Sequence, residues 1–249
     1  MGKAGGVPEL IGTVEAAAKL SLSLRVVGRR EDGYHLLDAE MVTVNLTDSL
    51  QFRPGDGLRV SGPAAARVPR GRANLIIAAL AAVGRRVQVS LVKRIPVGAG
   101  LGGGSADAAA VLRWAGCRDE DVAARLGSDV PFCLVGGRGR VRGTGERVDA
   151  LPWEPMAGRM FTLLTPPFGV STASVYRAWD DLGGPTGEGP NDLEPAALLV
   201  EPRLAEWRDR FAAAVGQTPV LAGSGSTWFV EGSHPGEGRV VVQTIRPEG

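Results

Sequence analysis

Apolar and polar residues alternate with a period of two at several places along the chain, and this pattern predicts β-strands. Between residues 13 and 29, Leu20, Leu22 and Leu24 alternate with serines, so that every second side chain faces the same side. The Asp32-Gly33 pair that follows is typical of a hairpin turn. Further strands are expected at residues 41–46, 87–92, 160–165, 220–221, 228–230 and 239–245, with a short one within residues 54–72.

Segments with the character of helices lie between these strands. They are expected at residues 74–83, 105–114, 119–126, 172–182, 193–200 and 203–215. Asn74 and Ser105 are of the residue types that cap helix N-termini. Because helices and strands are mixed without strict alternation, the sequence predicts an α+β fold in two lobes. The boundary is expected near residues 153–158, which gives an N-terminal domain of residues 1–155 and a C-terminal domain of residues 156–249.

The most informative stretch is a run of glycines between an expected strand and an expected helix. It contains Pro96, Gly98, Gly100, Leu101, Gly102, Gly103, Gly104 and Ser105. Glycine adopts positive φ at little cost and lets a ligand approach the backbone closely. The N–H groups of such a loop at a helix N-terminus form a binding site for an anion, and phosphate is the obvious candidate.

Other interpretations of the glycine run fit less well. A P-loop needs Lys-Ser or Lys-Thr after the glycines, and neither is present. Gly98, Gly100 and Gly103 fit the dinucleotide fingerprint, but a second helix follows where that fingerprint needs a strand ending in an acidic residue. A flexible linker would not be flanked by an alternating strand and a periodic helix.

Composition and charge narrow the class of protein. The chain has 249 residues, of which 44% are hydrophobic and 22% charged, and its formal net charge is +1. These values are ordinary for a globular protein and give no reason to expect a nucleic-acid or acidic-membrane partner. No apolar run is long enough to span a bilayer. Residues 1–12 are expected to be an irregular leader without the apolar core of a signal peptide, so the expected location is the cytoplasm.

Four polar residues are candidates for chemistry, and each has a plainer explanation. Lys19 begins an apolar strand, where a lysine often extends along the edge to reach water. Asp129 lies two residues before a proline, which suits a helix N-cap. Tyr34 and His35 follow the hairpin turn, where an exposed aromatic pair is unremarkable. The two cysteines have neither metal nor redox spacing, and no Ser/His/Asp set suggests hydrolysis.

Taken together, these motifs form an ordered set. Along the chain they are AKLSLSL at 18–24, DGYH at 32–35, PVGAGLGGGSADAAAVL at 96–112, GSDVPF at 127–132 and GSGS at 223–226. The set resembles that of the 4-diphosphocytidyl-2-C-methyl-D-erythritol kinases, a family of GHMP kinases in non-mevalonate isoprenoid precursor biosynthesis. The glycine run alone indicates the superfamily, whereas DGYH and GSDVPF are specific to this family within it.

The resemblance implies a two-lobed fold and a kinase activity. The N-terminal lobe would be ribosomal-protein-S5-like and the C-terminal lobe ferredoxin-like. The activity implied is transfer of the γ-phosphate of ATP to the 2-hydroxyl of a small-molecule substrate, a cytidine diphosphate-linked polyol. Magnesium is expected to bridge oxygens of ATP and to be held mostly by the nucleotide and water.

The resemblance also implies roles for the residues that match its motifs. The stretch from Pro96 to Ser105 would hold the phosphates of ATP, with Asn74 on the adenine side. Asp129 would be the general base beside Lys19, because a lysine next to a carboxylate keeps it ionised. Phosphoryl transfer depends mainly on such positioning and charge neutralisation.

Substrate contacts are implied at the remaining motifs. Tyr34 would stack on the cytosine, and His35 would hydrogen-bond its edge. The other implied substrate-binding residues are Ser21, Asp129, Gly223, Ser224 and Gly225.

Two departures from the family pattern bear on function. The family usually has Asn where this chain has Ser21, and a hydroxyl cannot reproduce an amide's donor and acceptor pair. The family usually has a helix before its last strand, but residues 232–238 are too few and too rich in Gly and Pro to form one. One face of the C-terminal sheet is therefore expected to expose apolar surface that could bind a second copy in a homodimer. Two alternatives stay open: a kinase of another small alcohol, and a non-catalytic nucleotide-binding descendant.

Overall fold

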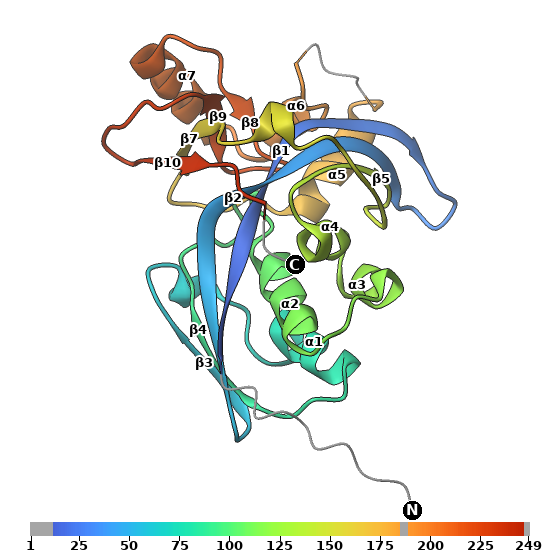
Figure 1. The fold of residues 1–249 in the computed structure, drawn as a ribbon. Helices are drawn as coiled ribbons and strands as arrows, with labels where there is room; N and C mark the ends of the chain where they lie inside the picture. Colours follow the sequence, from blue (N-terminus) through green and yellow to red (C-terminus); the bar gives the residue numbers. More distant parts are fainter. Residues whose placement is uncertain (1–11, 185–188, 247–249) are drawn as a thin grey trace, which may run out of the picture.

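The computed structural model describes residues 12–184 and 189–246 (Figure 1). These residues form a six-stranded sheet and a four-stranded sheet with helices packed on them, which confirms the α+β fold. The leader expected at residues 1–12 lies outside the described residues apart from Gly12, which begins the first strand. Within the described ranges, no helix combines the length and the apolarity that crossing a membrane requires.

A long hairpin runs through the molecule and carries residues at both ends of the site described below. Its strands are β1 (Gly12–Arg29) and β2 (His35–Arg53), which pair antiparallel over almost their whole length. The Asp32-Gly33 pair lies in the turn between them, and Gly33 has a φ of +90°, a conformation that glycine adopts without strain. Figure 1 shows both strands extending from the helices α1 and α2 to the helices α5 and α6.

The second strand of this hairpin organises the first sheet. The strand order is β3–β4–β2–β5–β6, with β1 on β2. The remaining bounds are β3 Gly57–Ser61, β4 Gln88–Val92, β5 Arg138–Gly143 and β6 Arg147–Ala150. β4 pairs with the C-terminal half of β2 and β5 with its N-terminal half. The strand expected at residues 41–46 is therefore much longer, because two separate partners extend it in both directions.

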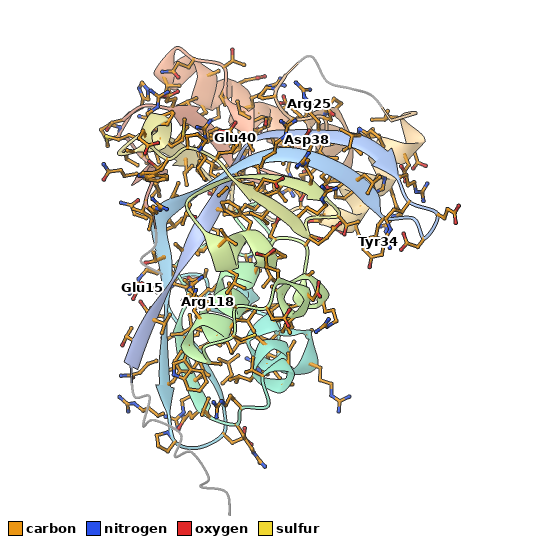
Figure 2. The ribbon with its side chains drawn as sticks, turned by 45° about the vertical axis from the view of Figure 1, so that its right-hand side comes forward. Glu15, Arg25, Tyr34, Asp38, Glu40 and Arg118 are labelled. Carbon is orange, nitrogen blue, oxygen red and sulfur yellow. The ribbon has the colours of Figure 1, made fainter. Side chains whose placement is uncertain are left out.

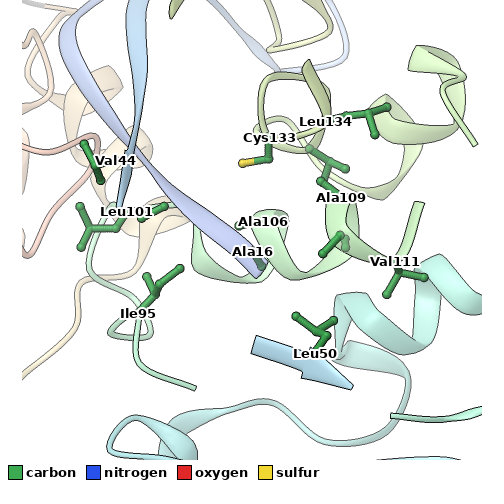
Figure 3. Packing of buried hydrophobic residues seen from close by; sticks show 14 of the residues in the cluster. Ala16, Val44, Leu50, Ile95, Leu101, Ala106, Ala109, Val111, Cys133 and Leu134 are labelled. Atoms are coloured by element: carbon green, nitrogen blue, oxygen red, sulfur yellow. The ribbon is translucent and has the colours of Figure 1, made fainter. Parts of the chain in front are cut away.

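Four helices pack beside this sheet. They are α1 (Leu75–Ala82), α2 (Gly103–Trp114), α3 (Glu120–Leu126) and α4 (Val130–Val135). The alanine-rich helix α2 lies at the centre, because its small side chains let it approach β1 closely. Figure 3 shows Ala16 of β1 beside Ala106 of α2 within the buried apolar cluster.

Two helix starts differ from the sequence-based expectation. α2 begins at Gly103 and not at Ser105, because Gly102 takes the N-cap position with a φ of +66°. Ser105 therefore lies in the first turn and caps nothing. α4 is not among the helix ranges expected from the sequence, although Asp129 suits its N-cap, and Pro131 fits its first turn, where the missing N–H of proline is not needed. The predicted cap of α1 is confirmed, since the Asn74 side chain accepts a hydrogen bond from the N–H of Ile76.

The second sheet has the strand order of a ferredoxin-like sandwich. Its strands are β7 (Met160–Leu164), β8 (Val220–Leu221), β9 (Trp228–Glu231) and β10 (Arg239–Gln243), in the antiparallel order β10–β7–β9–β8. The first crossover carries α5 (Thr172–Asp181), α6 (Glu194–Val200) and α7 (Arg203–Val215). The second crossover, residues 232–238, contains no helix, as the sequence predicted.

A loop takes the place of that second helix. Thr162 of β7 is fully buried beneath it: its hydroxyl donates to the carbonyl of Gly232 and accepts from the N–H of His234. Met160 and Val240 stay 40% and 49% exposed, but the strand register places them on opposite faces of the sheet. The expected apolar face is thus reduced to separate side chains, and the homodimer stays a prediction without one continuous patch on these two strands to support it.

Two apolar clusters hold the protein together, and both cross the expected domain boundary. The first contains the alanines of α2 together with Phe161 and Phe229 of the second sheet. The second joins Leu24 and Met41 of the long hairpin to Trp228 and to the helices α5, α6 and α7. The division into residues 1–155 and 156–249 stays a prediction. We propose that the two parts unfold in one transition, because they share their cores.

The packing of the C-terminal helices can be tested with one matched pair of leucines. Leu204 of α7 is fully buried, whereas Leu199 of α6 is 59% exposed. We expect Leu204→Ala to lower the free energy of unfolding by about 2–5 kcal/mol, since it removes contacts and leaves a cavity. Leu199→Ala should change it by less than about 0.5 kcal/mol. Urea unfolding followed by circular dichroism measures both, and equal losses would contradict this packing.

Candidate active site

A cavity of about 880 Å³ lies between the long hairpin, the glycine run, α5 and the segment after β8. Most residues singled out in the sequence line it: Lys19, Tyr34, His35, Asn74, Pro96, Gly98, Gly100, Leu101, Gly102, Gly103, Gly104, Ser105, Asp129, Gly223 and Ser224. Ser21 and Gly225 lie behind this wall and do not line the cavity. The fold therefore gathers segments from residue 19 to residue 224 around one space.

Lys19 and Asp129 form an ion pair on the cavity wall. The Nζ–Oδ2 distance is 3.3 Å, and the lysine side chain is 5% exposed while the aspartate is 30% exposed. The backbone N–H of Lys19 donates to the carbonyl of Leu101, which fixes this part of β1 against the glycine run. A reacting group in the cavity can thus reach the carboxylate more easily than the ammonium.

The plainer explanation is wrong for Lys19, and for Asp129 it is right about the position but not about the side chain. Lys19 does not extend to water but is buried. Asp129 occupies the N-cap position of α4, yet its side chain makes no capping hydrogen bond. The carboxylate turns toward Lys19 instead, so a group that is suited to capping is used for the ion pair.

Ser21 contacts the Lys19 ammonium on the side away from the cavity. The Lys19 ammonium donates to its hydroxyl at 3.1 Å, and Ser21 is almost completely buried. The ammonium is therefore held by a hydroxyl on one side and a carboxylate on the other. The position at which the family usually has Asn contacts Lys19 here and does not line the cavity.

The glycine run has backbone conformations that require glycine at three places. Gly98, Gly100 and Gly102 have φ values of +71°, +77° and +66°. A Cβ on Gly100 would lie 1.9 Å from the carbonyl oxygen of Ala222, so the run packs backbone to backbone against the segment after β8. This contact joins the two halves of the molecule next to the N-terminus of α2, where unpaired N–H groups can bind an anion.

Asn74 also lines the cavity, but its side-chain amide is already used. Its oxygen accepts from the N–H of Ile76, and its nitrogen donates to the carbonyl of Pro69 at 2.9 Å. The side chain therefore shapes residues 69–74 on this wall and has little capacity left for a direct hydrogen bond to a ligand.

Sequence analysis missed a buried charge cluster beneath the glycine run. The ammonium of Lys93 lies 2.5 Å from Asp48 and 2.7 Å from Asp107, and all three side chains are buried. Asp48 also accepts the backbone N–H groups of Arg94 and Ile95. A Cβ on Gly103 would lie 2.9 Å from the ammonium, so the cluster supports the first residue of α2. The one feature of the sequence that could have indicated this cluster is Lys93, a lysine directly after the alternating strand at 87–92.

Burial raises the pKa of Asp107 to about 7, against the opposing effect of Lys93. One oxygen of this carboxyl group has no hydrogen-bond partner among the described residues, which agrees with a group that is costly to ionise. Within the cluster, the carboxylate of Asp48 has more hydrogen-bond partners than the carboxyl group of Asp107.

The other end of the cavity is aromatic. Tyr34 is 62% exposed at the turn of the hairpin, where Figure 2 labels it. The side chain of His35 is only 10% exposed. The expectation of an exposed aromatic pair is therefore confirmed for Tyr34 and wrong for His35. The His35 ring stacks on Tyr176 of α5 with centroids 4.6 Å apart, and its Nε2 lies 2.8 Å from Asp180. Tyr176 and Asp180 escaped sequence analysis because nothing in a short helix 145 positions away points to His35.

Ser224 and Gly223 close the cavity from the second sheet. The hydroxyls of Ser224 and Thr172 are hydrogen-bonded at 2.8 Å. A Cβ on Gly223 would lie 3.3 Å from the Lys19 ammonium. This segment therefore reaches the same lysine that pairs with Asp129.

The backbone contact of the glycine run gives a first prediction for this site. We expect Gly100→Ala to weaken ATP binding by at least about tenfold, because the loop must move to relieve the clash with Ala222. Gly84→Ala is the matched control: its φ is also positive, at +61°, but a Cβ there would meet nothing within 4 Å. Isothermal titration calorimetry measures ATP affinity, and equal affinities of the two variants would contradict the contact.

The raised pKa of Asp107 predicts a pH dependence of stability. The folded protein binds more protons than the unfolded chain between the ordinary value of 3.8 and about 7. The stabilising contribution of this group is therefore present at low pH and is lost as the pH rises through that window. Asp107→Asn does not titrate, so its free energy of unfolding should fall less than that of the wild type from about pH 4 to 7. Urea unfolding at both pH values checks this, and identical slopes would contradict it.

Comparison with known proteins identifies relatives along most of the chain. The family model for the GHMP kinases N terminal domain matches residues 74–137. A 4-diphosphocytidyl-2-C-methyl-D-erythritol kinase of Paramagnetospirillum magneticum is 36% identical, over 87% of this chain and 87% of the relative. The enzyme of that name from Pelotomaculum thermopropionicum is 39% identical, over 87% of this chain and 88% of the relative.

Solved structures agree with these relatives. A crystal structure of 4-(cytidine 5'-diphospho)-2C-methyl-D-erythritol kinase superposes with a TM-score of 0.68 at 35% identity, covering 88% of this chain and 89% of the other. A mevalonate kinase superposes with a TM-score of 0.59 at 11% identity, which shows a shared fold and no more. From the sequence identity and the extent of the match, this chain belongs to the 4-diphosphocytidyl-2-C-methyl-D-erythritol kinase family of the GHMP kinases.

Proposed function

We propose that this protein transfers the γ-phosphate of ATP to the 2-hydroxyl of 4-diphosphocytidyl-2-C-methyl-D-erythritol. The observation that carries the proposal is the Lys19–Asp129 pair, 3.3 Å apart on the wall of the cavity that also contains the glycine run. The relatives named above carry this substrate in their names, and the size of the cavity, about 880 Å³, suits two ligands of this kind.

ATP would bind with its phosphates at the glycine run. The N–H groups at the start of α2 and the positive-φ glycines Gly98, Gly100 and Gly102 offer donors without side chains in the way. The Lys93 cluster beneath Gly103, of which Lys93 and Asp107 also line the cavity, would keep this surface in place. Asn74 would shape the neighbouring wall on the adenine side.

The chemical step needs a base and charge neutralisation. The 2-hydroxyl of the substrate would give its proton to the Asp129 carboxylate, its oxygen would bond to the γ-phosphorus, and the bond from that phosphorus to the β,γ-bridging oxygen would break to release ADP. Lys19 would hold the Asp129 carboxylate in orientation, with Ser21 fixing the lysine. Most of the acceleration would come from alignment of the two ligands.

The substrate would extend from this pair toward the aromatic end. Tyr34 would stack on the cytosine, and His35 would hydrogen-bond its edge, with Tyr176 behind the imidazole ring. Gly223 and Ser224 would close over the middle of the substrate, beside the Lys19 ammonium, whereas Gly225 lies behind them.

Magnesium is proposed as the counterion of ATP. Across the described parts of the chain, no cluster of three His, Cys, Asp or Glu side chains suits a metal cage. On a nucleotide, Mg²⁺ is commonly bound by phosphate oxygens and water. When bound, it would neutralise part of the phosphate charge.

The alternatives drawn from the sequence have less support. A non-catalytic descendant was suggested by Ser21, but Ser21 hydrogen-bonds Lys19 and leaves the Lys19–Asp129 pair intact. If the substrate were a different small alcohol without a base, the aromatic end around His35 would have no group to bind.

The base assignment predicts the effect of Asp129→Asn. We expect the variant to lose about 10²–10⁴-fold in kcat, because its amide cannot accept the proton, while ATP affinity changes little. ADP release with Mg-ATP and 4-diphosphocytidyl-2-C-methyl-D-erythritol measures this.

The matched control for that prediction is Asp121→Asn on the exposed surface of α3, which should keep wild-type turnover. Full activity of Asp129→Asn would show that Asp129 is not the base. A wild-type protein that binds ATP but releases no ADP with this substrate would contradict the proposed reaction.

A further inference from the structure

The turn between β5 and β6, residues 143–146, packs against the residue that precedes the proposed base. A Cβ on Gly145 would lie 2.8 Å from the carbonyl carbon of Ser128 and nearer still to its oxygen, so the two segments touch backbone to backbone. Ser128 and Thr144 also line the cavity. The turn therefore supports the cavity wall at the point where the chain reaches Asp129.

Asp129 depends on its neighbours along the chain for its position. Its side chain makes no capping hydrogen bond at the start of α4, and the ion pair with Lys19 holds the carboxylate from one side. Its backbone belongs to a tight turn over residues 127–130, which a hydrogen bond of 3.0 Å closes between its ends. Ser128 lies inside this turn, so the contact with Gly145 fixes where the turn and the base lie.

The rest of the β5–β6 hairpin supports α4 by apolar packing. A Cβ on Gly139 of β5 would lie 3.4 Å from the ring of Phe132 on α4. Val148 of β6 packs against the apolar cluster that contains Phe132. Since these contacts hold the body of the helix, the polar turn has the separate task of holding the residues before it.

The carboxylate of Glu146 holds the turn in its shape. Its Oε2 accepts hydrogen bonds from the backbone N–H of Thr144 at 2.6 Å and from the Thr144 hydroxyl at 2.8 Å. Gly143 and Gly145 have φ values of +72° and +116°, and glycine gives a turn little conformational restraint of its own. A Cβ on Gly143 would lie 2.6 Å from Cδ of Glu146, so the acidic side chain folds back onto the turn.

Glu146 is ionised at neutral pH. Burial alone would raise its pKa, but hydrogen bonds from its own N–H and from Thr144, together with the charge of Arg30, hold the pKa of Glu146 below its ordinary value of 4.5. An ionised carboxylate is a stronger hydrogen-bond acceptor than a neutral group. The two bonds to Thr144 are therefore of the stronger kind.

We propose that Glu146 is a positioning residue for the chemical step: it locks the β5–β6 turn, which fixes Ser128 and so places the Asp129 carboxylate for proton transfer. This inference rests on the proposed function, in which Asp129 is the base. Glu146 does not itself line the cavity, so it acts without touching the ligands. A displacement of about 1 Å in the reacting groups can cost about 10²-fold in rate.

The first test removes the carboxylate and then restores an acceptor. We expect Glu146→Ala to lower kcat at least about tenfold, measured as ADP release with Mg-ATP and 4-diphosphocytidyl-2-C-methyl-D-erythritol. ATP affinity, measured by calorimetry, should change by less than about twofold, because the glycine run is a different part of the wall. Glu146→Gln keeps an acceptor for Thr144 and should recover most of the turnover.

The matched control for this test is Glu120→Ala, since Glu120 is exposed on α3, and it should keep the wild-type kcat. Unchanged turnover of Glu146→Ala would overturn the proposal. So would a Gln variant as slow as the Ala variant, or an equal loss of turnover and ATP affinity, which would show general damage to the structure.

The second test disturbs the contact from the turn itself. We expect Gly145→Ala to lower kcat at least about tenfold, because the added methyl group must displace Ser128. Gly57→Ala is the matched control: its φ is also positive, at +106°, but a Cβ there would meet nothing within 4 Å. Equal kcat values of these two variants would contradict the role of the contact.

A double-mutant cycle tests whether Glu146 acts through Asp129. The Asp129→Asn variant has no base to position, so adding Glu146→Ala to it should change the residual kcat by less than about twofold. A further loss as large as that caused by Glu146→Ala alone would show that the two residues act independently, and the proposal would be wrong.

The outcomes separate this inference from the proposed function. If the wild type phosphorylates the substrate and Asp129→Asn does not, but Glu146→Ala keeps full turnover, the role of Glu146 is wrong and the kinase stands. If the wild type releases no ADP, or if Asp129→Asn is fully active, the proposed reaction or its base fails and the inference fails with it.

Discussion

A buried ammonium group is costly unless several partners surround it, and Lys19 obtains its partners from separate parts of the chain. Its Nζ donates to Ser21 on the same strand and pairs with Asp129 at the start of α4. Its aliphatic chain lies so close to Gly102 that a Cβ there would be 2.8 Å from Cγ. Its backbone N–H bonds Leu101. The strand, the glycine run and α4 therefore take their relative positions from this one side chain.

The long hairpin links the two ends of the cavity, the end with the Lys19–Asp129 ion pair and the aromatic end around His35. β1 carries Lys19 near its middle, and β2 begins with His35 at the far end of the hairpin. Lys19 beside the glycine run and His35 at the aromatic end thus belong to one continuous hairpin, and their separation is fixed by the rise of a β-strand. The second sheet contributes the segment after β8 and the helix α5, so each end is completed by residues from beyond position 165.

The C-terminal sheet shows how a missing helix is tolerated. The crossover between β9 and β10 consists of residues 232–238, and a polar residue, Thr162, lies under it. The loop satisfies that hydroxyl with its own backbone groups, so the buried side chain of Thr162 is fully paired. The helices of the first crossover cover the second sheet, and Leu204 and Phe211 are among their buried residues.

The sequence by itself determined what depends on neighbours along the chain. The alternation of β1, the Asp32-Gly33 turn, the Asn74 cap and the positive-φ glycines are local properties, and the structure has each of them. Most residues predicted for the site also line the cavity, because their motifs are short and contiguous. That they surround one cavity is a property of the fold.

Tertiary structure decided the pairings between distant positions. Lys93 meets Asp48 from 45 residues away, and His35 meets Asp180 from 145 residues away. The start of α2 also depended on a contact, since Gly102 takes its left-handed conformation against Lys19. No periodicity or propensity carries such information, because burial and charge pairing arise only when the strands and helices are packed. The residues proposed to take part in the chemistry could therefore be predicted from local sequence motifs. The residues that hold them in position could be identified only from the tertiary structure.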